Sequence, residues 1–97
     1  MQVQMERRAE VQLRFLDKSE QRQIARALKK LAVADAEMLS QTPGIRPLRL
    51  GISDKQFYGF RATPELELVL SVDADTCTLE DVVSKDRLDR LLVGAAA

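Results

Sequence analysis

The sequence of 97 residues lacks histidine and tryptophan and contains one cysteine, Cys77. Without histidine the chain has no imidazole base, no Ser-His-Asp triad and no Cys/His zinc set, and a single cysteine cannot form an internal disulfide. No apolar run approaches the roughly 20 residues of a membrane span, and the N-terminal MQVQMERR lacks the apolar block of a secretory signal. These absences exclude many enzyme classes, predict no metal, cofactor or membrane partner, and favour a cytoplasmic protein.

The charge is balanced overall but unevenly distributed. The composition, 45% hydrophobic and 31% charged, is ordinary for one globular domain over residues 1–97. Residues 1–50 hold 10 Lys/Arg against 6 Asp/Glu, and residues 51–97 hold 5 against 9, so the net charge is zero. Because a nucleic-acid binder normally has a net positive field, such a role would require a local basic patch.

The segment 57–72, FYGFRATPELELVLSV, predicts an antiparallel hairpin at the centre of a sheet. Apolar residues alternate from Leu66 to Val72, which is the period of a half-buried strand with one face toward a core. In the preceding run Tyr58 and Phe60 share a face, and Pro64 interrupts the pattern between the two strands.

Two helical segments are expected before the hairpin. The first begins at Arg7, with Val11 and Phe15 widening its apolar stripe, and the second begins at a capping box formed by Asp17 and Glu20. The core stripe of the second helix has helical spacing, and the helix is expected to continue through Leu39. The members of the stripe are Ile24, Ala27, Leu28 and Leu31.

Four cations of the second helix, Arg22, Arg26, Lys29 and Lys30, lie outside that stripe. They form either a solvated face, which is the usual place for surface charge, or a nucleic-acid contact.

The remaining pattern predicts further strands and a C-terminal helix. The expected elements are an edge strand at 1–5, a short strand at 48–50 ending at Gly51, turns at 53–55 and 73–75, a strand at 76–83, a short helix capped by Ser84 whose Leu88, Leu91 and Leu92 share a face, and a frayed tail at 94–97. We therefore expect an α+β domain in which two N-terminal helices pack on one face of a three- or four-stranded antiparallel sheet, followed by a short C-terminal helix.

The order of these elements resembles the RelE/ParE superfamily of bacterial type II toxins. The similarity spans MERRAEVQLRFLDKSEQRQIARALKKLA, LRLG and FYGFRATPELELVLSVDADTCTLEDVVSKDRLDRL. It implies a cytoplasmic toxin that a co-encoded antitoxin neutralises. RelE-like members cleave messenger RNA on the ribosome, whereas ParE-like members inhibit DNA gyrase without being nucleases.

The resemblance also implies which residues would act if the chain is a nuclease. The catalytic candidates are Arg49, Arg61 and Lys85, and the candidates for nucleic-acid contact are Arg46, Lys55, Tyr58 and Arg87. Cations without histidine can stabilise charge on a phosphate that its own 2′-hydroxyl attacks.

Two departures from the family pattern weaken the nuclease interpretation. Glu67 stands where many active members carry an arginine, and the region of Leu88 and Asp89 stands where a tyrosine often ends the domain. A carboxylate facing a substrate phosphate would repel it at short range.

Each candidate also has a structural interpretation. Arg61 can pair across strands with Glu67 or Glu65, and Tyr58 can pack in the core with its hydroxyl at the rim. Cys77 is expected to be a small buried residue, while turn chemistry accounts for the acidic pair at 73 and 75.

Three hypotheses for the function follow from these patterns and the resemblance. The chain is a toxin that acts by binding, a ribosome-dependent endoribonuclease, or a non-toxic regulatory module that forms a homodimer.

Overall fold

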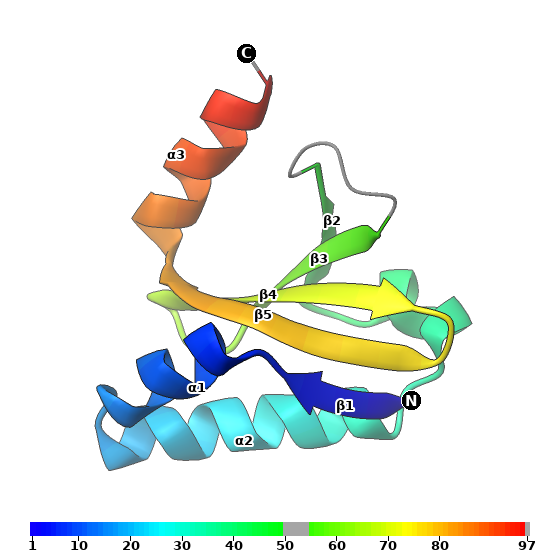
Figure 1. The fold of residues 1–97 in the computed structure, drawn as a ribbon, viewed down its shortest axis with the longest axis horizontal. Helices are drawn as coiled ribbons and strands as arrows, with labels where there is room; N and C mark the ends of the chain where they lie inside the picture. Colours follow the sequence, from blue (N-terminus) through cyan, green and yellow to red (C-terminus); the bar gives the residue numbers. More distant parts are fainter. Residues whose placement is uncertain (50–54, 97) are drawn as a thin grey trace.

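The computed structural model describes residues 1–49 and 55–96, with 91–96 as backbone only. In this part of the chain a five-stranded sheet, in the order β1-β5-β4-β3-β2, forms the centre of the fold (Figure 1). The strands are β1 (Gln2–Met5), β2 (Ile45–Leu48), β3 (Gln56–Arg61), β4 (Leu66–Asp73) and β5 (Thr76–Ser84). The helices are α1 (Arg7–Arg14), α2 (Lys18–Ala32), the 3₁₀ helix η1 (Ala36–Gln41) and α3 (Lys85–Ala96).

The sheet combines an antiparallel meander with one parallel edge strand. Strands β2 to β5 pair antiparallel with their chain neighbours, so the predicted hairpin and meander are confirmed. Strand β1 pairs with β5 in parallel, with Gln2 opposite Thr76 and Met5 opposite Leu79. The α+β class is confirmed, but the sheet has five strands and is mixed rather than purely antiparallel. The difference arises because β1 lies beside the last strand, while α1 and α2 carry the chain away from it before the meander begins.

Helices α1 and α2 cover one face of the sheet, as predicted (Figure 1). Helix α2 begins at a capping box in which the Asp17 carboxylate accepts a hydrogen bond from the Glu20 backbone N–H at 2.8 Å. Its stripe packs against the apolar face of the hairpin, and Leu28 is half-buried. The fully or nearly buried residues of this helix-side core are Ala9, Ile24, Ala27, Leu31, Leu39, Phe60, Leu68, Leu70, Cys77, Leu79 and Val82.

Two predictions for the helical region are wrong. Val11 and Phe15 are exposed, Phe15 to 82%, because the two-turn helix α1 directs only a narrow stripe around Ala9 toward β5. Helix α2 ends at Ala32 instead of continuing to Leu39. The chain then turns through an exposed Val33 and forms η1, which returns Leu39 to the core.

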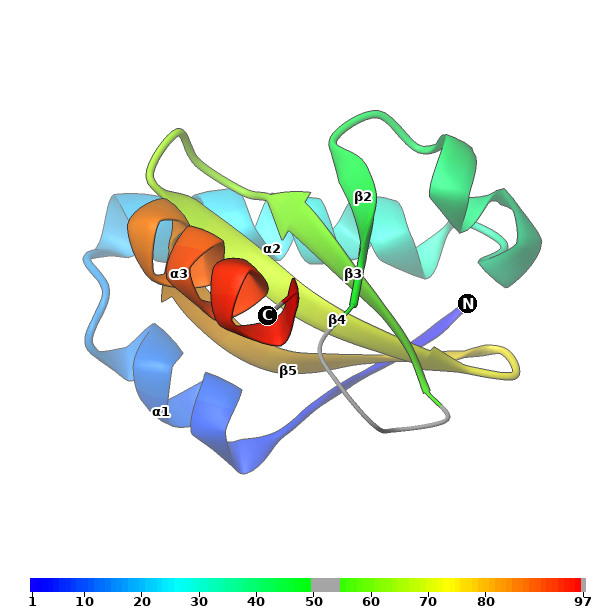
Figure 2. The ribbon, with the colours of Figure 1, turned by 90° about the horizontal axis from the view of Figure 1, so that it is seen from above.

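The beginning of α3 rests on the face of the sheet opposite α2, and the rest of the helix rises away from that face (Figures 1 and 2). Leu88 of α3 is fully buried against Leu48, Val69 and Val83, with Phe57 packed beside them. The prediction that the hairpin strand is half-buried is therefore wrong, because both faces of β4 are buried. None of the helices described here is long and apolar enough to cross a membrane.

The connections differ from the sequence predictions in detail. Strand β2 is Ile45–Leu48 and includes Pro47, which is tolerated because β2 is an edge strand. The predicted end of that strand at Gly51 and part of the turn at 53–55 lie outside the described residues. The turn at 73–75 is confirmed, with Ala74 at a φ of 53°. Ser84 accepts a hydrogen bond from the Arg87 N–H at 3.2 Å, as a helix cap does, and α3 extends to Ala96, into the segment predicted as a frayed tail.

Candidate functional site

A buried glutamate joined to two arginines lies on the α3 side of the sheet. The side chain of Glu67, on β4, is only 3% exposed. Arg46, on β2, places Nη2 at 3.2 Å from Oε1 and 3.3 Å from Oε2 of this carboxylate. Arg61, at the end of β3, lies directly opposite Glu67 in the strand register, with Nη2 at 3.7 Å from Oε1. The predicted pairing of Arg61 with Glu67 is thus confirmed.

Helix α3 contributes a second carboxylate to this site. Asp89 places Oδ1 at 3.8 Å from Nη2 of Arg46, and both side chains are about half exposed. Leu88, the adjacent residue, is fully buried on the sheet. Ion pairing at Arg46 and apolar packing at Leu88 therefore act together to hold α3 against β2 and β4. We refer to Arg46, Arg61, Glu67 and Asp89 as the arginine–glutamate cluster.

Gly59 provides the space that the cluster needs. It lies opposite Arg46 on β2, on the face that carries Glu67. A Cβ atom at this position would lie 3.0 Å from Oε2 of Glu67 and 3.4 Å from Cδ1 of Leu48. A side chain at Gly59 would therefore displace the carboxylate from between its partners.

The cluster is electrically balanced, with two guanidinium groups facing two carboxylates. A buried carboxylate needs such partners, since leaving it unpaired in the interior is costly. An incoming phosphate would compete with Glu67 for Arg46 and Arg61, and it would meet the repulsion of a carboxylate within a few ångströms of both. The arrangement is thus suited to fixing α3 on the sheet. An external anion can bind Arg46 or Arg61 only by competing with Glu67.

The structure places the other predicted site residues away from the contacts of the cluster. Arg49 is exposed just after β2. Lys85 begins α3, where its backbone N–H donates to the Glu65 carbonyl at 2.9 Å. Lys55 pairs with Glu80 at 3.8 Å.

Two further candidates lie on other surfaces. Arg87 is exposed on α3 and lines a separate hollow with Arg8. Tyr58 is half-buried against the helix-side core, consistent with the core-packing alternative. Of the residues predicted for catalysis or nucleic-acid contact, Arg46 and Arg61 therefore belong to the cluster.

Three features of this site were not predicted from the sequence. These are Arg46 as the nearest partner of Glu67, Asp89 as a second carboxylate, and Gly59 as the residue that makes room. The sequence did contain one indication of this site. Gly59 lies two residues before Arg61 on the same face of a strand, and a glycine inside a strand often marks the close approach of another group.

The described residues show little other reactive chemistry. Cys77 is fully buried on β5, and burial raises the pKa of its thiol to about 11, which leaves the nucleophilic thiolate scarce at neutral pH. Among the side chains that the structure describes, no three histidine, cysteine, aspartate or glutamate residues come together as candidate metal ligands.

Comparisons with known proteins identify the fold. No family model and no curated protein matches the sequence. A chain of the archaeal RelE-RelB complex from Pyrococcus horikoshii OT3 superposes with a TM-score of 0.70 at 16% identity, covering 89% of this chain and 96% of that one. A metal-bound toxin from Helicobacter pylori gives a TM-score of 0.60 at 17% identity, with coverages of 91% and 98%. The chain therefore has the RelE/ParE-like toxin fold.

Proposed function

We propose that this protein is the toxin of a type II toxin-antitoxin pair, that it acts in the cytoplasm by binding a cellular target, and that a cognate antitoxin neutralises it. The fold supports the class, because the similarity covers nearly all of this chain and of the archaeal chain, which was crystallised as a RelE-RelB complex. Sequence identity of 16% supports a shared fold alone, and the activity depends on the residues that this chain carries.

The main support for inhibition by binding, without cleavage, is the position of Glu67 between Arg46 and Arg61. Cleavage of RNA by its own 2′-hydroxyl requires cations that are available to stabilise charge on the phosphate. In this chain a buried carboxylate already occupies both arginines of the cluster. A protein of this kind inhibits growth by occupying a partner surface, and DNA gyrase is the target that the resemblance to ParE-like members suggests.

A ribosome-dependent endoribonuclease is the second candidate. The observation that favours it is the exposure of its three proposed catalytic cations, because Arg49 and Lys85 are exposed and the Arg61 side chain is 49% exposed despite its ion pair. Under this alternative, Arg61→Ala abolishes RNA cleavage while circular dichroism shows a folded domain. Cleavage that persists in folded Arg61→Ala removes Arg61 from the site.

Growth of a bacterial host after induced expression tests the proposed class. We expect growth to stop when the chain is induced alone and to resume when the small open reading frame adjacent to its gene is co-expressed. A matched control is Leu68→Asp, which places a charge in the fully buried core and should abolish both folding and growth arrest. Arrest by this variant would mean that overexpression itself, and not the folded toxin, stops growth.

The same assay separates the third hypothesis, a non-toxic module that forms a homodimer. In the described part of the sheet, the outer edge of β2 has no strand paired to it, so it could accept a second copy. If soluble, folded protein accumulates to a high level while growth continues unchanged, the toxin proposal is wrong and the homodimeric module becomes the better account.

A further inference from the structure

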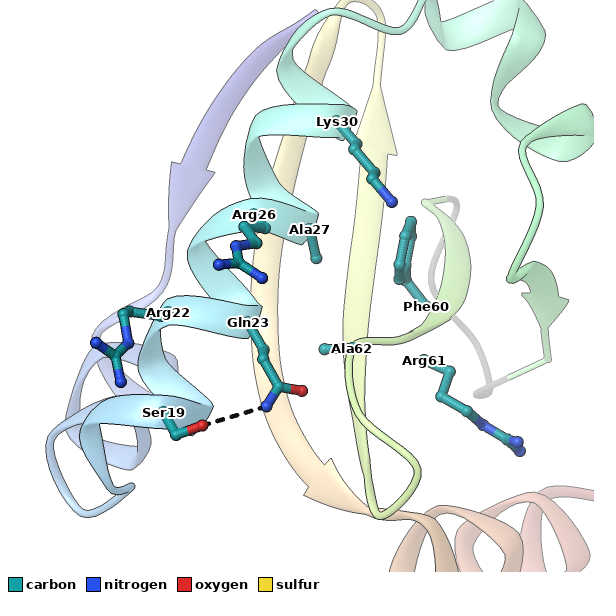
Figure 3. A pocket seen from close by; sticks show the side chains of 9 residues that line it. All are labelled: Ser19, Arg22, Gln23, Arg26, Ala27, Lys30, Phe60, Arg61 and Ala62. Carbon is teal, nitrogen blue, oxygen red and sulfur yellow. Dashed lines mark hydrogen bonds between the residues drawn. The ribbon is translucent and has the colours of Figure 1, made fainter.

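A basic groove lies between α2 and the end of β3, on the face of the sheet that α2 covers. Its volume is about 500 Å³, and its cationic lining residues are Arg22, Arg26, Lys30 and Arg61. Phe60 forms part of the apolar lining, and the Lys30 side chain is directed toward its ring (Figure 3). Arg61 also lines the neighbouring hollow that contains Glu67, so it connects the groove with the cluster.

Three of the four cations of the groove, Arg22, Arg26 and Lys30, have no acidic partner among the described residues. No carboxylate of a described residue lines it. Within the described ranges 1–49 and 55–96, Arg22, Arg26 and Lys30 have no carboxylate oxygen within ion-pair distance, whereas Arg46 and Arg61 both do. Figure 3 shows Lys30 directed over the groove, while Arg22 and Arg61 are directed outward from its two sides, so the cations flank the groove and would attract an anionic group that enters it.

The spacing of the helix cations matches an extended acidic peptide. Arg22, Arg26 and Lys30 follow one another at four-residue intervals on α2, which places successive charges about 6 Å apart along the helix axis. In an extended chain, side chains on one face are about 6.6 Å apart, because each residue rises about 3.3 Å and every second one points the same way. Acidic residues at alternate positions of an extended segment can therefore meet successive cations of α2.

The groove is less suited to a nucleic-acid strand. Single-stranded nucleic acid is commonly held by aromatic side chains on which bases stack, in addition to basic residues. The aromatic residue of the groove, Phe60, is only 7% exposed, and Tyr58 packs in the helix-side core. The chain also has no net positive charge to attract a polyanion from a distance.

We propose that the groove lined by Arg22, Arg26, Lys30 and Arg61 binds an acidic, extended segment of the neutralising partner protein. The identity of the partner rests on the proposed function. The acidic character of the segment is inferred from the cations that line the groove. Carboxylates at alternate positions pair with the cations of α2, and small apolar side chains between them face Phe60 and Ala62 on the opposite wall of the groove.

Titration of the purified protein with a short peptide of alternating glutamate and alanine tests this inference. We expect binding that weakens as salt is added, since the pairs are near the surface. The double variant Arg22→Gln/Arg26→Gln should weaken binding about tenfold, which corresponds to losing two exposed ion pairs. The matched control, Lys18→Gln/Lys29→Gln, removes the same charge from α2 residues outside the groove and should change binding by less than about twofold.

Three outcomes would overturn the proposal. The first is that the peptide binds no better than its counterpart with glutamine in place of glutamate. The second is that the two double variants lose the same affinity, which would indicate a general charge effect. The third is that a single-stranded oligouridylate binds more tightly than the peptide and loses affinity in Arg22→Gln/Arg26→Gln, which would make the groove a nucleic-acid site. This assay does not depend on growth arrest, so its failure is distinguishable from failure of the proposed function.

Discussion

Replacing Arg46 and replacing Glu67 should lower the free energy of unfolding by different amounts, although the two residues form one ion pair. At 3.2 Å, and with the effective dielectric constant of about 20 that suits sites near a protein surface, the gross attraction is about 5 kcal/mol. The net value is smaller, because the carboxylate is almost fully removed from water while the Arg46 side chain remains 44% exposed. This difference in exposure determines which substitution is more damaging.

Arg46→Met keeps most of the apolar stem but leaves the buried carboxylate with Arg61 alone, at the longer distance of 3.7 Å. We expect it to lower the free energy of unfolding by about 2–3 kcal/mol, somewhat below the usual cost of breaking a fully buried pair. Glu67→Gln leaves two guanidinium groups that can return to water, so we expect a loss of about 1 kcal/mol. The double variant should lose about 1–2 kcal/mol, less than Arg46→Met alone, because it has no buried charge to leave unpaired.

Urea unfolding followed by circular dichroism measures these differences through the transition midpoint at constant slope. Arg49→Met is the matched control, because Arg49 is an exposed arginine just after the same strand and should cost less than about 0.5 kcal/mol. A larger loss for Glu67→Gln than for Arg46→Met would refute the reasoning. So would a double variant whose loss equals the sum of the two single losses.

Three further predictions concern the core around the sheet. Gly59→Ala should lower the free energy of unfolding by about 1–3 kcal/mol in the same urea assay, because its Cβ would lie 3.0 Å from the Glu67 carboxylate, and a neutral result would show that this carboxylate moves freely. Leu88→Ala should cost about 2–4 kcal/mol by opening a cavity under α3, whereas the exposed Arg87→Ala should change stability little; equal effects would contradict the packing of α3 on the sheet. For Cys77, the folded pKa of about 11 exceeds the ordinary value of 9.0, so the stability that the protonated thiol contributes is fully present below pH 9 and is lost as the pH rises toward 11. The difference in unfolding free energy between the wild type and Cys77→Ala should therefore shrink by about 2 kcal/mol between pH 9 and 11, and a constant difference would contradict the burial of the thiol.

The helix-side half of the fold could be predicted from the sequence because its signals are local and periodic. The stripe from Ile24 to Leu31 and the alternation from Leu66 to Val72 each repeat with the period of their element, and both face the same core. The capping box at Asp17 also depends only on residues three positions apart. Each of these features is specified within a short stretch of chain.

The other half depends on contacts that no local pattern specifies. Glu67 occupies a position that alternation assigns to solvent, and it is buried because Arg46 and α3 arrive from segments distant in the sequence. The parallel pairing of β1 with β5 likewise joins the first strand to the last. Periodicity in the sequence indicates which residues are apolar on one face, but it does not indicate which element will cover the other face.

The candidate site was predicted in part for the same reason. The pairing of Arg61 with Glu67 follows from the hairpin, since a short connection places the two residues opposite each other. Arg46 comes from a third strand whose register depends on the fold, and Asp89 depends on the direction of α3. The sequence resemblance indicated that Glu67 stands where many RelE-like toxins carry an arginine, and the structure shows this carboxylate paired with two arginines.

The integrity of messenger RNA during growth arrest tests the central proposal most directly, because it separates inhibition by binding from cleavage in the same cells. Total RNA is taken before and after induction of the wild-type chain, and the length of abundant transcripts is compared, with folded Arg61→Ala as a parallel sample. We predict that growth stops while the transcripts remain at full length. Transcripts cut soon after induction of the wild type but intact with Arg61→Ala would contradict the account and assign the chain to the endoribonucleases.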